Sequence, residues 1–222
     1  MPDNHLDALT TIIKKNDMVG KLAVHRLHSH EPLGGGEIKL ESKLETAPGK
    51  WMRPVLADSL DPADLHGLAF KIEHNGGGNA AFTLIPYEFA KGPSPIVKDD
   101  KRALACMAEL ANNIIQKDLV DVLALQFVEG DDAGTTAEVE VGGLGTITLP
   151  QSMQKIGTLV PVSWSSPVDP ASQLPSPPPG QHWNESKKPD GTITHKVHVD
   201  NVDTEDGVLK SLADQGIVIL AF

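Results

Sequence analysis

Histidine is the residue type in this chain with the clearest potential for chemistry. The sequence contains nine histidines, and five of them lie in two short segments. The first segment holds His25, His28 and His30, and the second holds His195 and His198. Imidazole gains and loses a proton near neutral pH and is a common ligand of transition metals. Clusters of this kind are therefore typical of proton-transfer and metal sites.

The pattern from Lys21 to His30 predicts how the first three histidines are oriented. Apolar and polar residues alternate there, which indicates a β-strand. Side chains two positions apart in a strand share a face and lie about 6 to 7 Å apart. We therefore expect His28 and His30 to face one pocket, while His25 faces the opposite side. His28 and His30 are the predicted acid–base residues.

The same two rings are candidate ligands of a metal ion. A further ligand is expected from the second histidine segment or from Glu37, and the sequence leaves open a divalent transition metal as cofactor. The predicted metal set is His28, His30, His195 and His198. The chain has no His-Glu-x-x-His motif and only one cysteine, so neither of those metal-site patterns is expected. An alternative also stays open, in which these histidines lie on edge strands and take no part in chemistry.

Two further segments are candidates for contact with a substrate. Arg53 follows Trp51 by two positions, so both share a strand face, and a guanidinium group suits a carboxylate or enolate. Residues 165–190 are polar and rich in proline, which predicts a long surface loop or lid. The predicted substrate-binding residues are Trp51, His182 and Trp183, and Arg53 is the predicted anion-stabilising catalytic group. Trp51 is equally compatible with a place in the core.

Composition and charge limit the partners of the protein. Basic residues number 19 and acidic residues 30, so the net charge is −11, which disfavours binding to nucleic acid or to anionic membranes. No apolar run approaches the ~18 residues that a membrane span needs, and no signal peptide opens the chain. The single cysteine, Cys106, cannot form an intramolecular disulfide, and we expect a cytoplasmic protein.

The elements that must position these residues predict an α+β fold within a single domain, residues 1–222. We expect a mainly antiparallel twisted sheet or open β-barrel, because many short alternating segments are separated by glycine and proline. Ile38 to Leu44 has the clearest alternation, with a charged face expected to be exposed. One long amphipathic helix is expected at 98–117, and a C-terminal helix–strand unit at 203–222. The glycine triplets at 34–36 and 76–78 are expected to be hairpin turns.

These observations favour an enzyme that acts on an organic small molecule by histidine acid–base chemistry. A lyase or isomerase suits the predicted residues, since such chemistry needs neither a phosphate-binding loop nor a serine nucleophile. The rival hypothesis is a non-catalytic ligand-binding or assembly module, in which the histidines and Trp183 form a contact surface. The sequence also leaves open a homo-oligomer.

Overall fold

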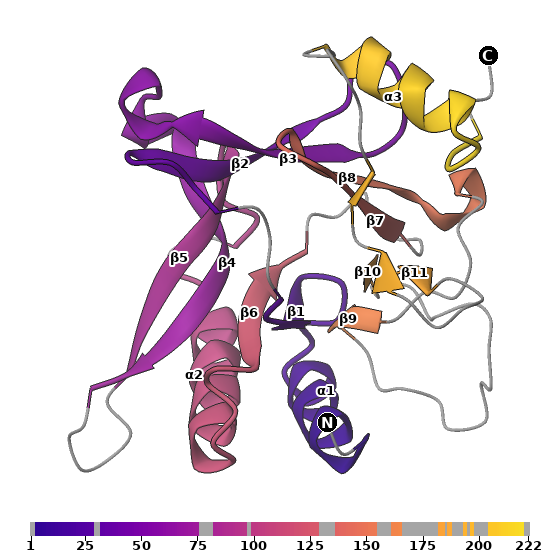
Figure 1. Ribbon diagram of the computed structural model, residues 1–222. Coiled ribbons are helices and arrows are strands. Elements are labelled where there is room, and N and C mark those ends of the chain that lie inside the picture. The colour runs from indigo at the N-terminus through magenta and orange to yellow at the C-terminus, as the bar shows by residue number, and fades with distance from the viewer. Residues whose placement is uncertain are drawn as a thin grey trace. The chain divides into compact units, whose positions relative to one another are not determined.

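The computed structural model places most of the chain in two compact units (Figure 1). It describes residues 3–28, 32–75, 82–96, 99–128, 136–154, 161–165, 182–184, 186–187, 193–194, 196–197 and 204–219. The first unit consists of Met1–His28, Ala63–Thr135 and Val162–Gln181, and the second of Ser29–Pro62, Thr136–Pro161 and His182–Phe222. Our expectation of one domain over residues 1–222 stays a prediction.

An antiparallel sheet forms the centre of the first unit. Its strands are β1 (Leu22–Arg26), β4 (Leu65–His74), β5 (Phe82–Lys91), β6 (Leu123–Phe127) and β9 (Pro161–Trp164). They pair in the order β9-β1-β6-β4-β5. Strands β1 and β6 are therefore central, and β6 is buried along its whole length, as its nearly continuous apolar sequence predicts.

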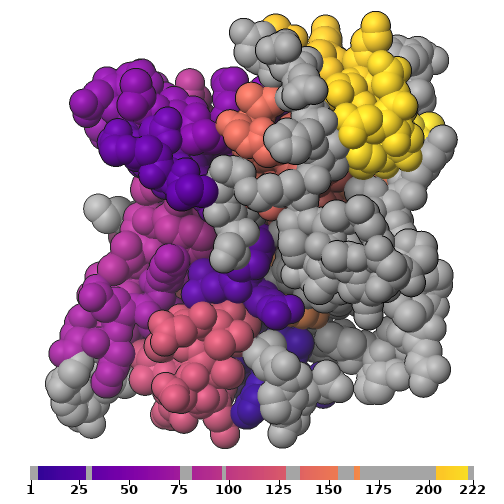
Figure 2. Space-filling model, viewed as in Figure 1, coloured from indigo at the N-terminus to yellow at the C-terminus, as the bar shows by residue number. Residues whose placement is uncertain are grey.

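Two helices pack against each other and against β1 and β6. Helix α1 (Asp3–Lys15) buries Leu6, Leu9, Ile12 and Ile13, which recur at spacings of three and four residues. Helix α2 (Lys101–Gln116) begins at Asp100, whose side chain accepts hydrogen bonds from the backbone N–H groups of Arg102 and Ala103, both at 3.0 Å. Figure 2 shows the solvent-facing side of α2 in pink.

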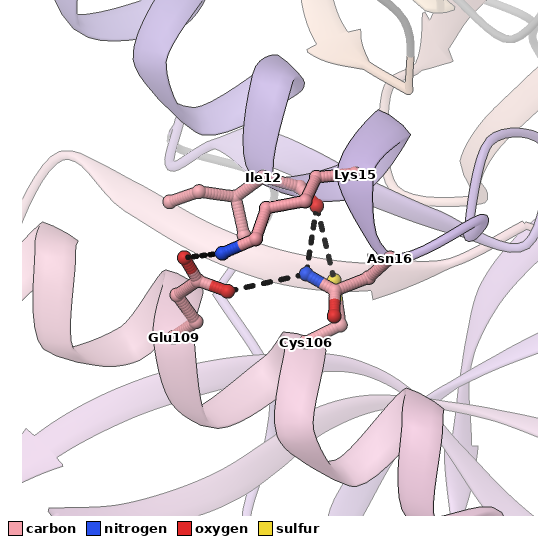
Figure 3. A network of polar contacts seen from close by, with 5 residues as sticks. All are labelled: Ile12, Lys15, Asn16, Cys106 and Glu109. Carbon is pink, nitrogen blue, oxygen red and sulfur yellow. Dashed lines mark hydrogen bonds and ion pairs between the residues drawn. The ribbon is translucent and has the colours of Figure 1, made fainter.

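Polar contacts join the end of α1 to α2 (Figure 3). The Glu109 carboxylate accepts hydrogen bonds from Lys15 Nζ at 3.1 Å and from Asn16 Nδ2 at 3.2 Å. These two bonds, that from Lys15 first, lower the pKa of the Glu109 carboxyl. Because the Lys15 and Glu109 side chains are 67% and 40% exposed, the ion pair contributes at most about 1 kcal/mol. It orients the helices more than it stabilises them.

The second unit has a mixed sheet. Strands β2 (Glu37–Lys43), β3 (Lys50–Leu56), β8 (Gly145–Pro150) and β7 (Thr136–Val141) pair antiparallel in that order. Strands β10 (His182–Asn184) and β13 (Lys196–Val197) then pair with β7 in parallel. A separate pair joins β11 (Ser186–Lys187) to β12 (Ile193–Thr194). Short 3₁₀ turns lie at Ala57–Ser59 (η1) and Gln151–Met153 (η3), and Pro62–Asp64 (η2) is a third.

Helix α3 (Glu205–Asp214) covers the core of the second unit. Thr204 precedes it as the N-cap and accepts a hydrogen bond from the Gly207 N–H at 3.4 Å. The buried core residues are Leu44, Trp51, Val139, Val141, Ile147, Leu149, Val208, Leu209, Leu212 and Val218. Glu205 Oε1 also accepts bonds from the backbone N–H groups of Glu45 and Thr46, at 2.7 and 2.9 Å. Its carboxylate thus ties the start of α3 to the turn between β2 and β3.

The fold is β-rich and of the α+β class, with three α-helices among the residues that the structure describes. Helix α2 lies within the 98–117 segment for which we expected the long helix. Val218 forms an isolated bridge with Gln154, whereas residues 220–222 lie outside the described part, so the closing strand stays a prediction, as does a barrel. Within the described ranges, no helix is long and apolar enough to cross a membrane.

Candidate functional site

Strand β1 carries the first histidine segment but is shorter than we expected. It ends at Arg26, so His28 lies two residues beyond the strand, and His30 lies outside the described residues. Strand alternation applies only where the backbone remains in the sheet. The reason that we gave for placing His28 and His30 on one face therefore does not hold at His28. Whether these two rings meet stays a prediction.

The structure instead brings His25 and His28 together. Their ring centroids lie 5.1 Å apart, and the ring planes are tilted by 48°. The expectation that His25 faces away from His28 is thus wrong, because the chain leaves the strand between them. His25 is only 3% exposed, whereas His28 is half-buried. One imidazole of the pair is thus fixed inside the unit, and the other reaches solvent.

A hydrogen bond to the backbone sets the tautomer of His28. Its Nδ1 lies 2.9 Å from the carbonyl oxygen of Arg26. A carbonyl oxygen only accepts hydrogen bonds, so Nδ1 must carry the proton and donate it. In the neutral ring Nε2 then holds the lone pair, and it is the atom that takes up a proton or binds a metal. His66 makes the same kind of bond, with Nδ1 at 2.9 Å from the carbonyl oxygen of Gly92.

Buried polar side chains surround His25 on its face of the sheet. Residues directly opposite each other in antiparallel strands share a face, and His25 lies opposite Ala124 of β6 and Ser163 of β9. Ser163 Oγ donates to Gln126 Oε1 at 2.9 Å, and both residues are less than 10% exposed. Gln126 lies two positions from Ala124 and so occupies the same face. The sequence analysis missed this face, because its signal is polar residues within segments that are otherwise apolar.

Arg53 lies in the second unit, in β3. Its Cζ is 5.0 Å from the centre of the Trp51 ring, so the two residues share a face as predicted. Trp51 is buried at 5% exposure, and its Nε1 donates to the Leu144 carbonyl at 2.9 Å. Arg53 itself is exposed and lines a small pocket that opens to solvent, together with Lys39, Met52, Pro54, Glu140 and Thr146 among others. A substrate-binding role for Trp51 stays a prediction.

The predicted loop at 165–190 differs from expectation at its C-terminal end. His182 and Trp183 lie in β10, where the backbone pairs in parallel with Thr136 and Ala137 of β7. Polarity and proline argued against regular structure there, but the edge of β7 supplies hydrogen-bond partners that the local sequence does not reveal. Residues 166–181 and 188–190 lie outside the described part, so a lid stays a prediction.

The second histidine segment does not form one continuous strand among the described residues. Ile193–Thr194 pairs with β11, whereas Lys196–Val197 pairs with β7. His195 and His198 lie outside the described residues, so the predicted metal set cannot be completed from the structure. Within the described ranges, no group of three or more His, Cys, Asp or Glu side chains is close enough to hold a metal ion.

Cys106 has the properties of a buried structural thiol. It is 0% exposed in α2, and its Sγ lies 4.0 Å from the Ile12 carbonyl oxygen (Figure 3). Burial, with a smaller effect from the Glu109 carboxylate, raises the pKa of the Cys106 thiol to about 11. The thiol is therefore protonated at neutral pH, which disfavours a role as a nucleophile.

Comparison with known proteins does not add a family to this description. No protein-family model, no curated protein and no solved structure matches the chain. Any assignment of function must therefore come from the residues and their geometry.

Proposed function

We propose that the protein is a cytoplasmic enzyme that moves a proton to or from an organic small molecule, with His28 as the general base. Lyase and isomerase reactions begin with such a step, typically at a carbon next to a carbonyl group. The observation that carries the proposal is the bond from His28 Nδ1 to the Arg26 carbonyl, because it makes Nε2 the proton-accepting atom. His30 and Arg53 stay in the proposal as the further acid–base and anion-binding groups.

The surroundings of His28 support this role. The ring is half-buried, so a small molecule can reach it while much of the bulk water is excluded. Its contact with the buried His25 ring, together with the bond to Arg26, restricts how the ring can turn. A general base acts efficiently when it is held in one orientation toward the proton that it removes.

Proton transfer can be tested without knowledge of the substrate. Wild-type protein is incubated in D₂O with a panel of 2-keto acids, 2-hydroxy acids, aldoses and ketoses, and deuterium incorporation at carbon is followed by proton NMR. We expect the protein to accelerate exchange in at least one compound, and His28→Ala to slow that exchange by about a hundredfold, as loss of a general base does.

The matched control is His66→Ala. His66 makes an equivalent Nδ1 bond to a backbone carbonyl but lies in β4, away from the segment that carries His25 and His28 in the sequence. We expect this variant to retain the wild-type exchange rate. The proposal fails if no compound of the panel exchanges faster with protein than without it, or if both variants exchange at the same rate.

A second function, binding without turnover, is favoured by the pocket beside Arg53. Lys39 and Arg53 place two cationic groups near the apolar side chains of Met52 and Pro54, and Glu140 adds one acidic group. Such a lining suits a small organic acid that carries an apolar portion. A panel compound that raises the melting temperature of wild type but not of Arg53→Ala, with no deuterium exchange, would favour this binding module over the enzyme.

A further inference from the structure

We propose that His25 and His28 together bind one divalent transition metal ion, such as Zn²⁺, with water completing its coordination. The inference deepens the proposed function and rests on the same site, because it gives that site a cofactor. It also replaces the predicted ligand set: His25 enters as a ligand, although the sequence pattern placed it on the opposite face from His28.

The spacing of the two rings is the first argument. A zinc–nitrogen bond is about 2.0 to 2.1 Å long, and a ring nitrogen lies about 1 Å from the ring centre. Two imidazoles on one tetrahedral ion therefore have centroids about 5 Å apart. The centroids of His25 and His28 are 5.1 Å apart, and their planes are tilted rather than parallel. The rings already have the separation that a shared ion requires.

The backbone bond of His28 is the second argument. A histidine that binds a metal through one ring nitrogen usually donates the N–H of the other to a carboxylate or a backbone carbonyl, which fixes the tautomer and the ring orientation. His28 makes this bond through Nδ1 to the Arg26 carbonyl at 2.9 Å. The lone pair of Nε2 is then the donor to the metal, and the Nδ1 proton stays in place.

The positions of the two residues favour a stable but open site. Strand β1 is paired on both sides, with β6 and β9, so the backbone that carries His25 is held in place. His28 reaches solvent, so water can occupy the remaining coordination positions and a small molecule can replace it. Two imidazole ligands favour zinc, nickel or copper over magnesium and calcium, which prefer oxygen ligands.

Zinc chloride is the probe that tests the inference. Protein without a polyhistidine tag is freed of metal with EDTA, exchanged into buffer and titrated with zinc chloride, while the ring nitrogens are followed in long-range ¹H–¹⁵N NMR spectra. We expect the signals of His25 and His28 to shift together and to saturate at one equivalent of zinc, while those of His66 stay unchanged. This readout uses the wild-type chain and does not depend on the folding of a variant.

Variants add an affinity measurement by calorimetry. Loss of a partner that only orients a ligand costs 10- to 100-fold in metal affinity, so loss of the ligand in His28→Ala should weaken zinc binding at least tenfold. The control His66→Ala should bind within twofold of wild type. The inference is wrong if the rings of His25 and His28 do not respond at one equivalent of zinc, or if both variants lose affinity equally.

Failure of the metal site can be told apart from failure of the proposed function. Deuterium exchange that continues at the full rate in EDTA, with no zinc shift at His25 and His28, removes the metal and keeps His28 as the base. A zinc shift at both rings without any exchange keeps the metal site and removes the enzyme. Exchange that requires zinc supports both, with a metal-bound water as the proton-transfer group.

Discussion

Replacement of Trp51 by alanine is expected to lower the free energy of unfolding by about 3 to 5 kcal/mol. The indole ring is 5% exposed and belongs to the core that α3 covers, so its removal leaves a cavity in the second unit. The Leu144 carbonyl also loses the donor that lies 2.9 Å away. Chemical denaturation followed by circular dichroism measures the change.

Trp51→Phe is the control that separates packing from hydrogen bonding. Phenylalanine keeps most of the aromatic surface but has no N–H for Leu144, so we expect a loss of about 1 kcal/mol beyond the effect of its smaller ring. If Trp51→Ala unfolds at nearly the wild-type denaturant concentration, the ring does not anchor the core. The substrate-binding role predicted from the sequence then becomes the better explanation of this residue.

Gly145→Ala is expected to destabilise the second unit by roughly 3 kcal/mol or more, from backbone strain and steric overlap together. Gly145 has a φ of +105°, and a Cβ at this position would overlap the carbonyl oxygen of Met52 in the neighbouring strand. Side chains other than hydrogen would push β8 away from β3 where the two strands pair. Thermal and chemical denaturation both report the loss.

Gly143→Ala provides the matched comparison in the same hairpin. Gly143 also has a positive φ, +78°, but no atom outside its immediate neighbours lies within 4 Å of a Cβ built there. This variant should therefore show only the cost of the left-handed backbone, about 1 to 2 kcal/mol. Equal losses in the two variants would contradict the close approach of β8 to β3 at Gly145.

Local patterns in the sequence predict the elements whose packing depends on one face. In α1, apolar residues at spacings of three and four are buried, and in β2 the alternation correctly places Leu40 in the interior at 4% exposure. The opposite face of β2 is less exposed than expected. Glu41 and Lys50 form an ion pair at 3.0 Å, with side chains only 13% and 10% exposed. Alternation shows which residues share a face, but not what covers that face.

The candidate site was only partly predictable, because its geometry depends on where strands end and pair. The alternation of β1 appears to an observer of the sequence to continue to His30, whereas the strand ends at Arg26. Nothing in residues 21–30 indicates that β6 and β9 flank this strand, so the burial of His25 was missed. The pairing of Trp183 with β7 likewise depends on a partner more than forty residues away in the sequence.

The tautomer of His28 and its distance from His25 test the central claim most directly. In long-range ¹H–¹⁵N spectra of the metal-free protein, at a pH where the ring is neutral, we predict a proton on Nδ1 of His28 and a bare Nε2. Nuclear Overhauser contacts should join the ring protons of His28 to those of His25. A proton on Nε2 instead, or the absence of contacts between the two rings, would contradict both the proposed base and the proposed metal site.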